Sequence, residues 1–95
     1  MKLIRDNIPK IMKEMGKQPK THIATEKEFE GALIGKLDEE LKEIKEGRNV
    51  EEVADLIEVA YTLAKEYGAT EEEVNALRKQ KNLKNGTFEK KIILE

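Results

Sequence analysis

Two short acidic motifs lie close together in the middle of the chain, and their carboxylates are spaced for joint action. Glu40 and Glu43 are three residues apart, and so are Glu52 and Asp55. Residues three apart lie on the same face of a helix, so each pair points in one direction. Carboxylates that converge from two helices suit a hard cation such as Mg²⁺ or Mn²⁺. Such a cation usually shares its ligands with substrate phosphates, so the motifs predict metal-dependent chemistry at a phosphate.

Each motif also has an explanation that requires no metal. Asn49 lies three residues before Glu52, which is the spacing of a capping box at the start of a helix. Lys36 lies four residues before Glu40, which is the spacing of an ordinary ion pair on a helix surface. Spacing alone therefore leaves a metal site and ordinary helix chemistry as open alternatives.

Capping signals divide the chain into the helical segments that must position these carboxylates. The expected N-caps are Thr25, Asn49 and Thr70. The expected C-caps are Gly16, Gly47 and Gly68. The expected helices cover about residues 6–15, 26–46, 50–67 and 71–83. The short turn between the second and third helices makes them antiparallel neighbours, which places both acidic pairs at a similar height.

The predicted fold is all-α, a small antiparallel helical bundle that forms one domain over residues 1–95. Residues 87–94 follow an Asn85-Gly86 turn, and a short strand that pairs with residues 21–23 is expected there. The apolar arc of the third expected helix spans about 220°, wider than one packing face requires. We therefore expect this helix to pack against a second copy as well, in a homodimer or a higher homo-oligomer.

Helical angles separate two of the four carboxylates from ordinary surface charge. Glu40 falls inside an apolar arc of about 120° on the second expected helix, and Lys36 and Glu43 lie just beside that arc. Glu52 falls inside the apolar arc of the third expected helix, with Asp55 at its edge. Burying a carboxylate without a partner costs several kcal/mol, so a cation, a metal ion or a proton must compensate.

Composition excludes several classes of function. Charged residues make up 40% of the chain and aromatic residues 4%, which favours a helical domain with a charged surface. The net charge of −2 provides no basic field for a nucleic acid polymer. With no cysteine and a single histidine, His22, a zinc site is not expected. No apolar run is long enough for a membrane span and no signal peptide is present, so we expect a cytoplasmic protein without membrane partners.

The residues around the acidic pairs resemble the all-α nucleoside triphosphate pyrophosphohydrolases of the MazG type, a superfamily that includes phosphoribosyl-ATP pyrophosphohydrolase. The signature of that superfamily is E-x-x-E, a short gap, then E-x-x-D. Here it corresponds to LDEELKE at residues 37–43 and EEVADL at residues 51–56. KLIRDNIP at residues 2–9 and KNLKNGTFEK at residues 81–90 resemble the borders of a compact phosphoribosyl-ATP-pyrophosphohydrolase-like subfamily. The resemblance therefore covers nearly the whole chain.

The resemblance implies a role for each charged position that matches the family. The implied Mg²⁺ ligands are Glu40, Glu43, Glu52 and Asp55. Glu39 is the implied catalytic acid that supports the metal or the attacking water. Basic residues implied to contact substrate phosphates are Arg5, Lys36, Lys81 and Lys84. The implied enzyme is a hydrolase that cleaves a nucleotide between its α and β phosphates, releasing a monophosphate and pyrophosphate, and that assembles as a dimer or tetramer.

Two alternatives to a general nucleoside triphosphate pyrophosphohydrolase stay open. One is hydrolysis of phosphoribosyl-ATP in histidine synthesis, which needs the same acidic motifs. The other is a non-catalytic dimeric helical module that binds a partner. The chain has no tryptophan, and Phe88 is expected in the core or an interface, so no residue is assigned to base recognition.

Overall fold

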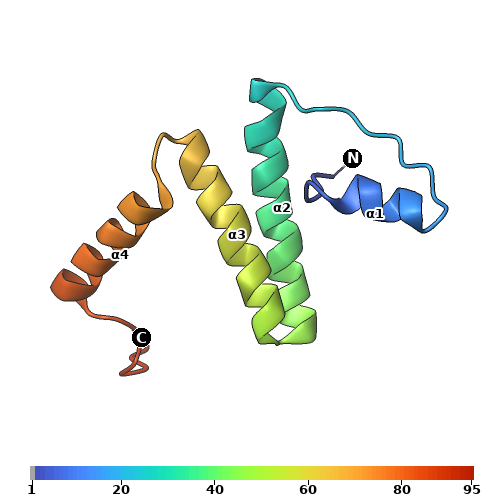
Figure 1. The fold of residues 1–95 in the computed structure, drawn as a ribbon. Helices are drawn as coiled ribbons and strands as arrows, with labels where there is room; N and C mark the ends of the chain where they lie inside the picture. The colour runs from blue at the N-terminus through green and yellow to red at the C-terminus, as the bar shows by residue number, and fades with distance from the viewer. Residues whose placement is uncertain (1) are drawn as a thin grey trace.

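The computed structural model describes residues 2–95, and its secondary structure there is entirely helical. The four helices are α1 (Ile8–Glu14), α2 (Glu26–Gly47), α3 (Val50–Glu66) and α4 (Glu71–Asn85) (Figure 1). Each lies close to the bounds expected from the capping signals, so the all-α prediction is confirmed. Within the same residues, no helix is long and apolar enough to cross a membrane.

A hairpin of two helices forms the body of the molecule. The chain reverses between Gly47 and Val50, and α3 returns alongside α2 (Figure 1). The helix α4 contacts α3 and leans away from the hairpin, whereas α1 lies on the other side of the hairpin, the side of α2 (Figure 1). Leu33 is the one apolar side chain among residues 2–95 that is fully buried, at 1% exposure. The hairpin therefore holds the two acidic motifs together on a thin core.

The turn between α2 and α3 differs in detail from the predicted glycine C-cap. Gly47 is the last helical residue of α2, and Arg48 instead adopts the left-handed conformation with φ of 52°. A Cβ atom at Gly47 would lie 3.1 Å from Asn49 Nδ2 and 3.6 Å from Glu52 Oε1. Glycine at this position leaves room for the Asn49 side chain, which caps α3.

The expected strand at the C-terminal end is wrong. Residues 87–95 contain no strand, and they leave α4 on the far side of the hairpin from residues 21–23 (Figure 1). Since the α2–α3 hairpin separates the two segments, their backbones cannot pair. Phe88, Ile92, Ile93 and Leu94 are instead between 81% and 97% exposed. Phe88 therefore contributes nothing to the core of a single chain.

Candidate metal centre

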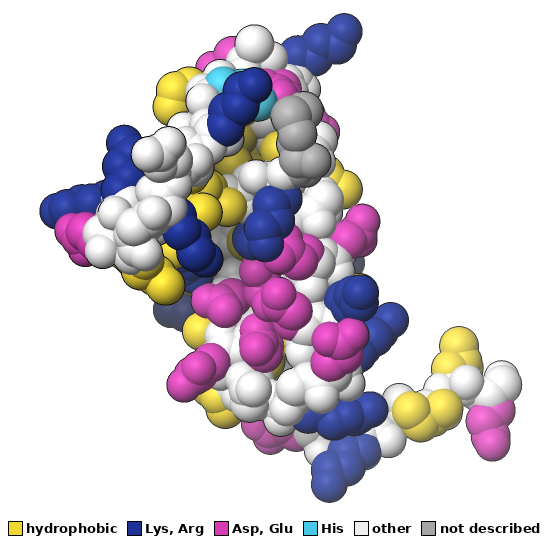
Figure 2. Space-filling model, turned by 90° about the vertical axis from the view of Figure 1, so that its right-hand side faces the viewer, with side chains coloured by type: hydrophobic (Ala, Val, Ile, Leu, Met, Phe, Trp, Pro, Cys, Tyr) yellow, Lys and Arg dark blue, Asp and Glu magenta, His cyan; other side chains and the backbone are white. Residues whose placement is uncertain are grey.

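Three carboxylates converge where α2 and α3 run side by side. Glu40 from α2 and Glu52 and Asp55 from α3 each offer an oxygen, and the three oxygens lie within 4.8 Å of one another. Acidic side chains gather in the middle of one face, and basic side chains lie around them (Figure 2). We call Glu40, Glu52 and Asp55 the acidic cluster. The structure thus brings together three of the four residues predicted to bind metal.

Glu40 is the most informative member of the acidic cluster because it is buried. The residue is 4% exposed, and its Oε1 lies 3.6 Å from Lys36 Nζ. Its Oε2 is buried and has no hydrogen-bond partner. An ion pair with Lys36 therefore accounts for only one of the two oxygens. A buried carboxylate oxygen without a partner is costly, and a hard cation shared with Glu52 and Asp55 would satisfy it.

The capping explanation for Glu52 holds only for its backbone. The Glu52 N–H donates to Asn49 Oδ1 at 3.1 Å, so Asn49 is the N-cap of α3. The reciprocal bond is missing, because the Glu52 side chain does not accept from the Asn49 N–H. Glu28 and Glu73 do make that bond at the starts of α2 and α4. The Glu52 carboxylate is therefore directed to the acidic cluster and not to its own helix.

Glu43, the fourth predicted ligand, borders the acidic cluster but contributes none of the three convergent oxygens. Burial raises the pKa of Glu40 above its ordinary value, and the Glu43 and Asp55 carboxylates raise it further against the opposing charge of Lys36. Desolvation also raises the pKa of Glu52, followed by a hydrogen bond to Glu43 and by the charges around it. A divalent cation bound there would therefore compete with protons for the same oxygens.

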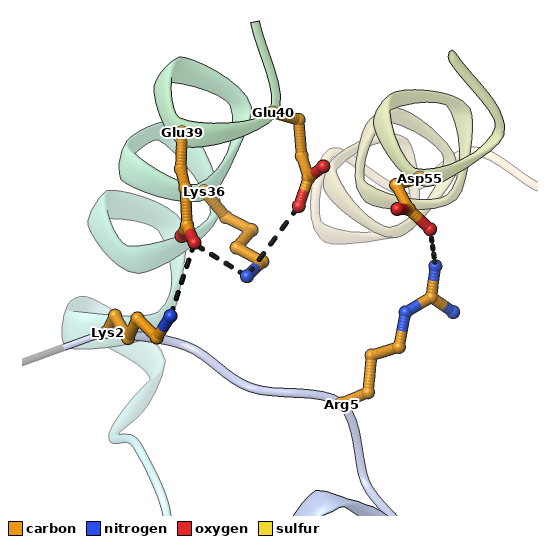
Figure 3. Close-up of polar contacts among 6 residues, drawn as sticks. All are labelled: Lys2, Arg5, Lys36, Glu39, Glu40 and Asp55. Carbon is orange, nitrogen blue, oxygen red and sulfur yellow. Dashed lines mark hydrogen bonds and ion pairs between the residues drawn. The ribbon is translucent and has the colours of Figure 1, made fainter. Parts of the chain in front are cut away.

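Glu39, the predicted catalytic acid, lies outside the acidic cluster and faces two lysines. It accepts hydrogen bonds from Lys2 Nζ at 3.3 Å and from Lys36 Nζ at 3.2 Å (Figure 3). Desolvation raises the pKa of Glu39, but the hydrogen bonds and charges of Lys36 and Lys2 outweigh it and leave the pKa below its ordinary value. Glu39 is therefore ionised at neutral pH. The contact from Lys2 was not anticipated, since nothing in the sequence joins it to a residue 37 positions away.

Two of the four predicted phosphate-binding cations lie beside the acidic cluster. Lys36, only 16% exposed, bridges Glu39 and Glu40 from within α2. Arg5 reaches across from the N-terminal segment and donates from Nη2 to Asp55 Oδ1 at 2.8 Å (Figure 3). The positive charge at the site therefore comes from two segments, and one of them is distant in sequence.

The other two predicted cations, Lys81 and Lys84, lie on the last turns of α4. That end of α4 points away from the α2–α3 hairpin (Figure 1). Lys81 helps to line a cavity of about 500 Å³, together with Arg78, Asn82, Asn85, Gly86, Thr87 and Phe88. Within one chain these two lysines are therefore not beside the acidic cluster.

Comparisons with protein-family models, curated proteins and solved structures found no match to this chain. The case for a functional site therefore rests on the side chains themselves. The acidic cluster has the oxygen ligands that Mg²⁺ or Mn²⁺ requires, and one of those oxygens is buried without a partner. An acidic patch that served only solubility would leave its carboxylates in water.

Proposed function

We propose that this protein is a Mg²⁺-dependent nucleotide pyrophosphohydrolase of the MazG type, with Mn²⁺ as a substitute metal. It cleaves a nucleoside triphosphate or a related nucleotide between the α and β phosphates. The observation that carries the proposal is the buried, unpartnered Oε2 of Glu40, in a side chain that meets Glu52 and Asp55 within 4.8 Å. The sequence resemblance supplies the reaction, and the geometry supplies a suitable set of ligands.

The proposed chemistry assigns a task to each charged group. Glu40, Glu52 and Asp55 would hold Mg²⁺, with the Glu43 carboxylate beside them. When bound, Mg²⁺ supplies positive charge against the phosphoryl oxygens and lowers the pKa of the attacking water. The water oxygen forms a bond to the α phosphorus while the bond to the α–β bridging oxygen breaks. The products are a nucleoside monophosphate, pyrophosphate and one proton.

Glu39 and the cations beside the acidic cluster orient the reactants in this proposal. Glu39 is ionised and can accept a hydrogen bond from the attacking water while Lys36 holds it in place. Lys36 and Arg5 lie where they can contact the phosphate oxygens of a nucleotide bound over the acidic cluster. Since nucleotides are the substrate, we place the reaction in the cytoplasm.

We further propose that the active form is a homodimer or a higher homo-oligomer with α3 in the interface. Val53 and Ile57 of α3 and Leu77 of α4 are between 42% and 55% exposed, and a single buried apolar residue is a small core for residues 2–95. In such an assembly, Lys81 and Lys84 can act at the acidic cluster of a partner copy. Light scattering at micromolar concentration tests this, and a monomeric mass would contradict it.

Product analysis tests the proposed reaction. The protein is incubated with Mg²⁺ and a panel of canonical and damaged nucleoside triphosphates together with phosphoribosyl-ATP. We expect equal amounts of monophosphate and pyrophosphate from at least one member. Release of single phosphates would contradict the cleavage position. If phosphoribosyl-ATP alone is cleaved, the enzyme belongs to histidine synthesis, and if nothing is cleaved, the non-catalytic binding module is the better interpretation.

A matched pair of variants links that activity to the acidic cluster. Glu40→Gln removes the charge of the buried carboxylate and keeps its shape, so turnover should be abolished. Glu46→Gln makes the same change on an exposed residue of α2 and should leave turnover unchanged. Helical circular dichroism should be the same for both variants. Full activity of Glu40→Gln would disprove the ligand assignment.

A further inference from the structure

The N-terminal segment, residues 2–5, runs beside the acidic face and carries a cation at each end. Lys2 contacts Glu39 of α2, and Arg5 contacts Asp55 of α3 (Figure 3). Leu3 and Ile4 between them are half-buried, so the segment is seated on the molecule by apolar contact as well as by charge. Only one of the two ion pairs involves a member of the acidic cluster, because Glu39 lies outside it.

We propose that Arg5 is an exchangeable counter-cation of the metal site. It competes with a divalent cation for Asp55, and on displacement its guanidinium becomes available to the phosphate groups of the substrate. This inference rests on the proposed function. It adds an order of binding to that function, in which the metal comes first and the phosphate second, and it assigns the coupling between them to one side chain.

Charge explains the competition. A guanidinium held at 2.8 Å from Asp55 neutralises part of the negative charge that a divalent cation needs from the acidic cluster. A cation bound at that cluster would in turn repel the guanidinium and weaken its hold on the carboxylate. The two positive groups therefore oppose each other at Asp55.

The exposure of the pair makes the exchange feasible. The Arg5 and Asp55 side chains are 58% and 41% exposed, so water and salt screen their attraction. Exposed ion pairs of this kind change a binding constant by at most about fivefold. Lys36 differs, because it is mostly buried and contacts two carboxylates from within α2. We therefore expect Lys36 to stay in place when a cation binds, and Arg5 to move.

Once it is displaced from Asp55, the Arg5 guanidinium is chemically suited to bind phosphate. A guanidinium presents paired N–H donors that match two phosphate oxygens, which a lysine ammonium does not. The exchange needs only a rotation of the Arg5 side chain, with the half-buried Leu3 and Ile4 left in place. Arg5 therefore binds the substrate phosphate only after the metal has bound.

Calorimetric titration with MgCl₂ alone tests the competition without any turnover. Arg5→Gln should bind Mg²⁺ more tightly than the wild type, by about two- to fivefold. Arg5→Lys keeps a competing cation and should bind Mg²⁺ about as the wild type does. Lys2→Gln is the matched control, since it removes a cation of the same segment that contacts Glu39 only, and its effect should be smaller than that of Arg5→Gln.

The opposite sign would overturn the inference. If Arg5→Gln binds Mg²⁺ more weakly, Arg5 positions Asp55 for the metal and does not compete with it. Equal affinity would also contradict competition. Either result leaves the proposed function standing, because Mg²⁺ still binds the wild type. If the wild type binds no Mg²⁺ at millimolar concentration, the proposed function fails as well.

Nuclear magnetic resonance of the arginine Nε–Hε groups supplies a second measurement. The chain has three arginines, Arg5, Arg48 and Arg78, so their signals can be resolved and assigned. Addition of Mg²⁺ should shift the Arg5 signal and leave those of Arg48 and Arg78 in place. An Arg5 signal that does not respond to saturating Mg²⁺ would show that the ion pair persists and would refute the exchange.

Discussion

Three helices of this molecule begin with the same chemical pattern, yet one of them uses it differently. At the starts of α2 and α4, Thr25 and Thr70 form reciprocal capping boxes with Glu28 and Glu73. At the start of α3, the Asn49 side chain accepts a hydrogen bond from the Glu52 N–H, but the Glu52 side chain accepts none from the Asn49 N–H. Its carboxylate lies with Glu40 and Asp55 instead.

The difference means that the Glu52 carboxylate does not cap its own helix. A reciprocal bond of this kind satisfies a backbone N–H that would otherwise depend on water. Glu52 forgoes that bond and lies among other carboxylates, where its pKa is raised by desolvation and by Glu43. Local stability alone would favour the arrangement of Glu28 and Glu73. A cation bound by the three carboxylates together would account for the exception.

The largest expected effect is a loss of turnover on substitution of Glu52 that does not occur on substitution of Glu73. Glu52→Gln should reduce pyrophosphohydrolase turnover by more than the roughly 10–100-fold that is typical for residues that merely support a metal ligand. Glu73→Gln alters a capping box and should leave turnover unchanged. Steady-state assays of the two variants, with circular dichroism as a check on folding, measure the contrast. Equal losses of activity in both variants would show that Glu52 is only a capping residue.

The second effect is the pH dependence of stability. It should have opposite signs for Glu52, whose side chain makes no capping bond, and for Glu28, whose side chain makes one. Because the folded state raises the pKa of Glu40 and Glu52, it holds protons that the unfolded chain has released, and these groups stabilise the fold less as pH rises. Without Mg²⁺, the melting temperature of Glu52→Gln relative to the wild type should therefore increase between pH 5 and pH 8.

At the start of α2 the expected sign reverses. Hydrogen bonds from His22 and from the Thr25 backbone lower the pKa of Glu28, so its stabilising contribution is present above the ordinary glutamate pKa and is lost as pH falls through the lowered value. Glu28→Gln should therefore be less stable than the wild type at neutral pH and approach it in acid. Melting curves of Glu28→Gln, carried from neutral pH to below the ordinary glutamate pKa, are compared with those of Glu52→Gln. The same sign in both would contradict the comparison.

The proposed Mg²⁺ site gives a related expectation, since Mg²⁺ bound at the acidic cluster would compete with protons there. The rise in melting temperature caused by millimolar Mg²⁺ should be larger at pH 8 than at pH 5, and it should disappear in Glu52→Gln. Scanning fluorimetry cannot use tryptophan here, because the chain has none, so circular dichroism is the suitable measurement. A rise that is independent of pH would place Mg²⁺ elsewhere on the surface.

The smallest expected effect is on stability alone. Thr70→Ala removes the hydroxyl that accepts from the Glu73 N–H at 3.1 Å and should lower the free energy of unfolding by about 1 kcal/mol. Mg²⁺ affinity should not change, because α4 supplies no member of the acidic cluster. Chemical denaturation and Mg²⁺ titration measure the two quantities. A loss of Mg²⁺ binding would show that α4 is coupled to the site.

The helices and the N-caps Thr25, Asn49 and Thr70 could be predicted from the sequence because they depend on near neighbours. Helical periodicity also singled out Glu40, which the structure buries at 4% exposure. Asn49 and Glu52 had the spacing of a capping box, and spacing alone could not show that the side-chain half of that box would be absent. The choice between the two partners of Glu52 depends on what α2 brings beside it.

Contacts between distant segments were decided by the tertiary structure. Arg5 meets Asp55 across 50 positions of sequence, and its predicted role near phosphates said nothing of this partner. Glu43 has the same helical spacing as the other predicted ligands, yet it contributes none of the three convergent oxygens, because their convergence depends on how α2 and α3 face each other.

The sequence by itself determined four helices, their boundaries and two acidic pairs at helical spacing, since residues within one or two turns control these features. Only the tertiary structure decided which carboxylates meet and that residues 87–94 form no strand. It also decided that the Glu52 side chain makes no capping bond to Asn49. The physical reason is the range of the forces involved. Hydrogen bonds and torsional preferences act along the chain, whereas the acidic cluster and its counter-cations exist only once packing has brought separate segments together.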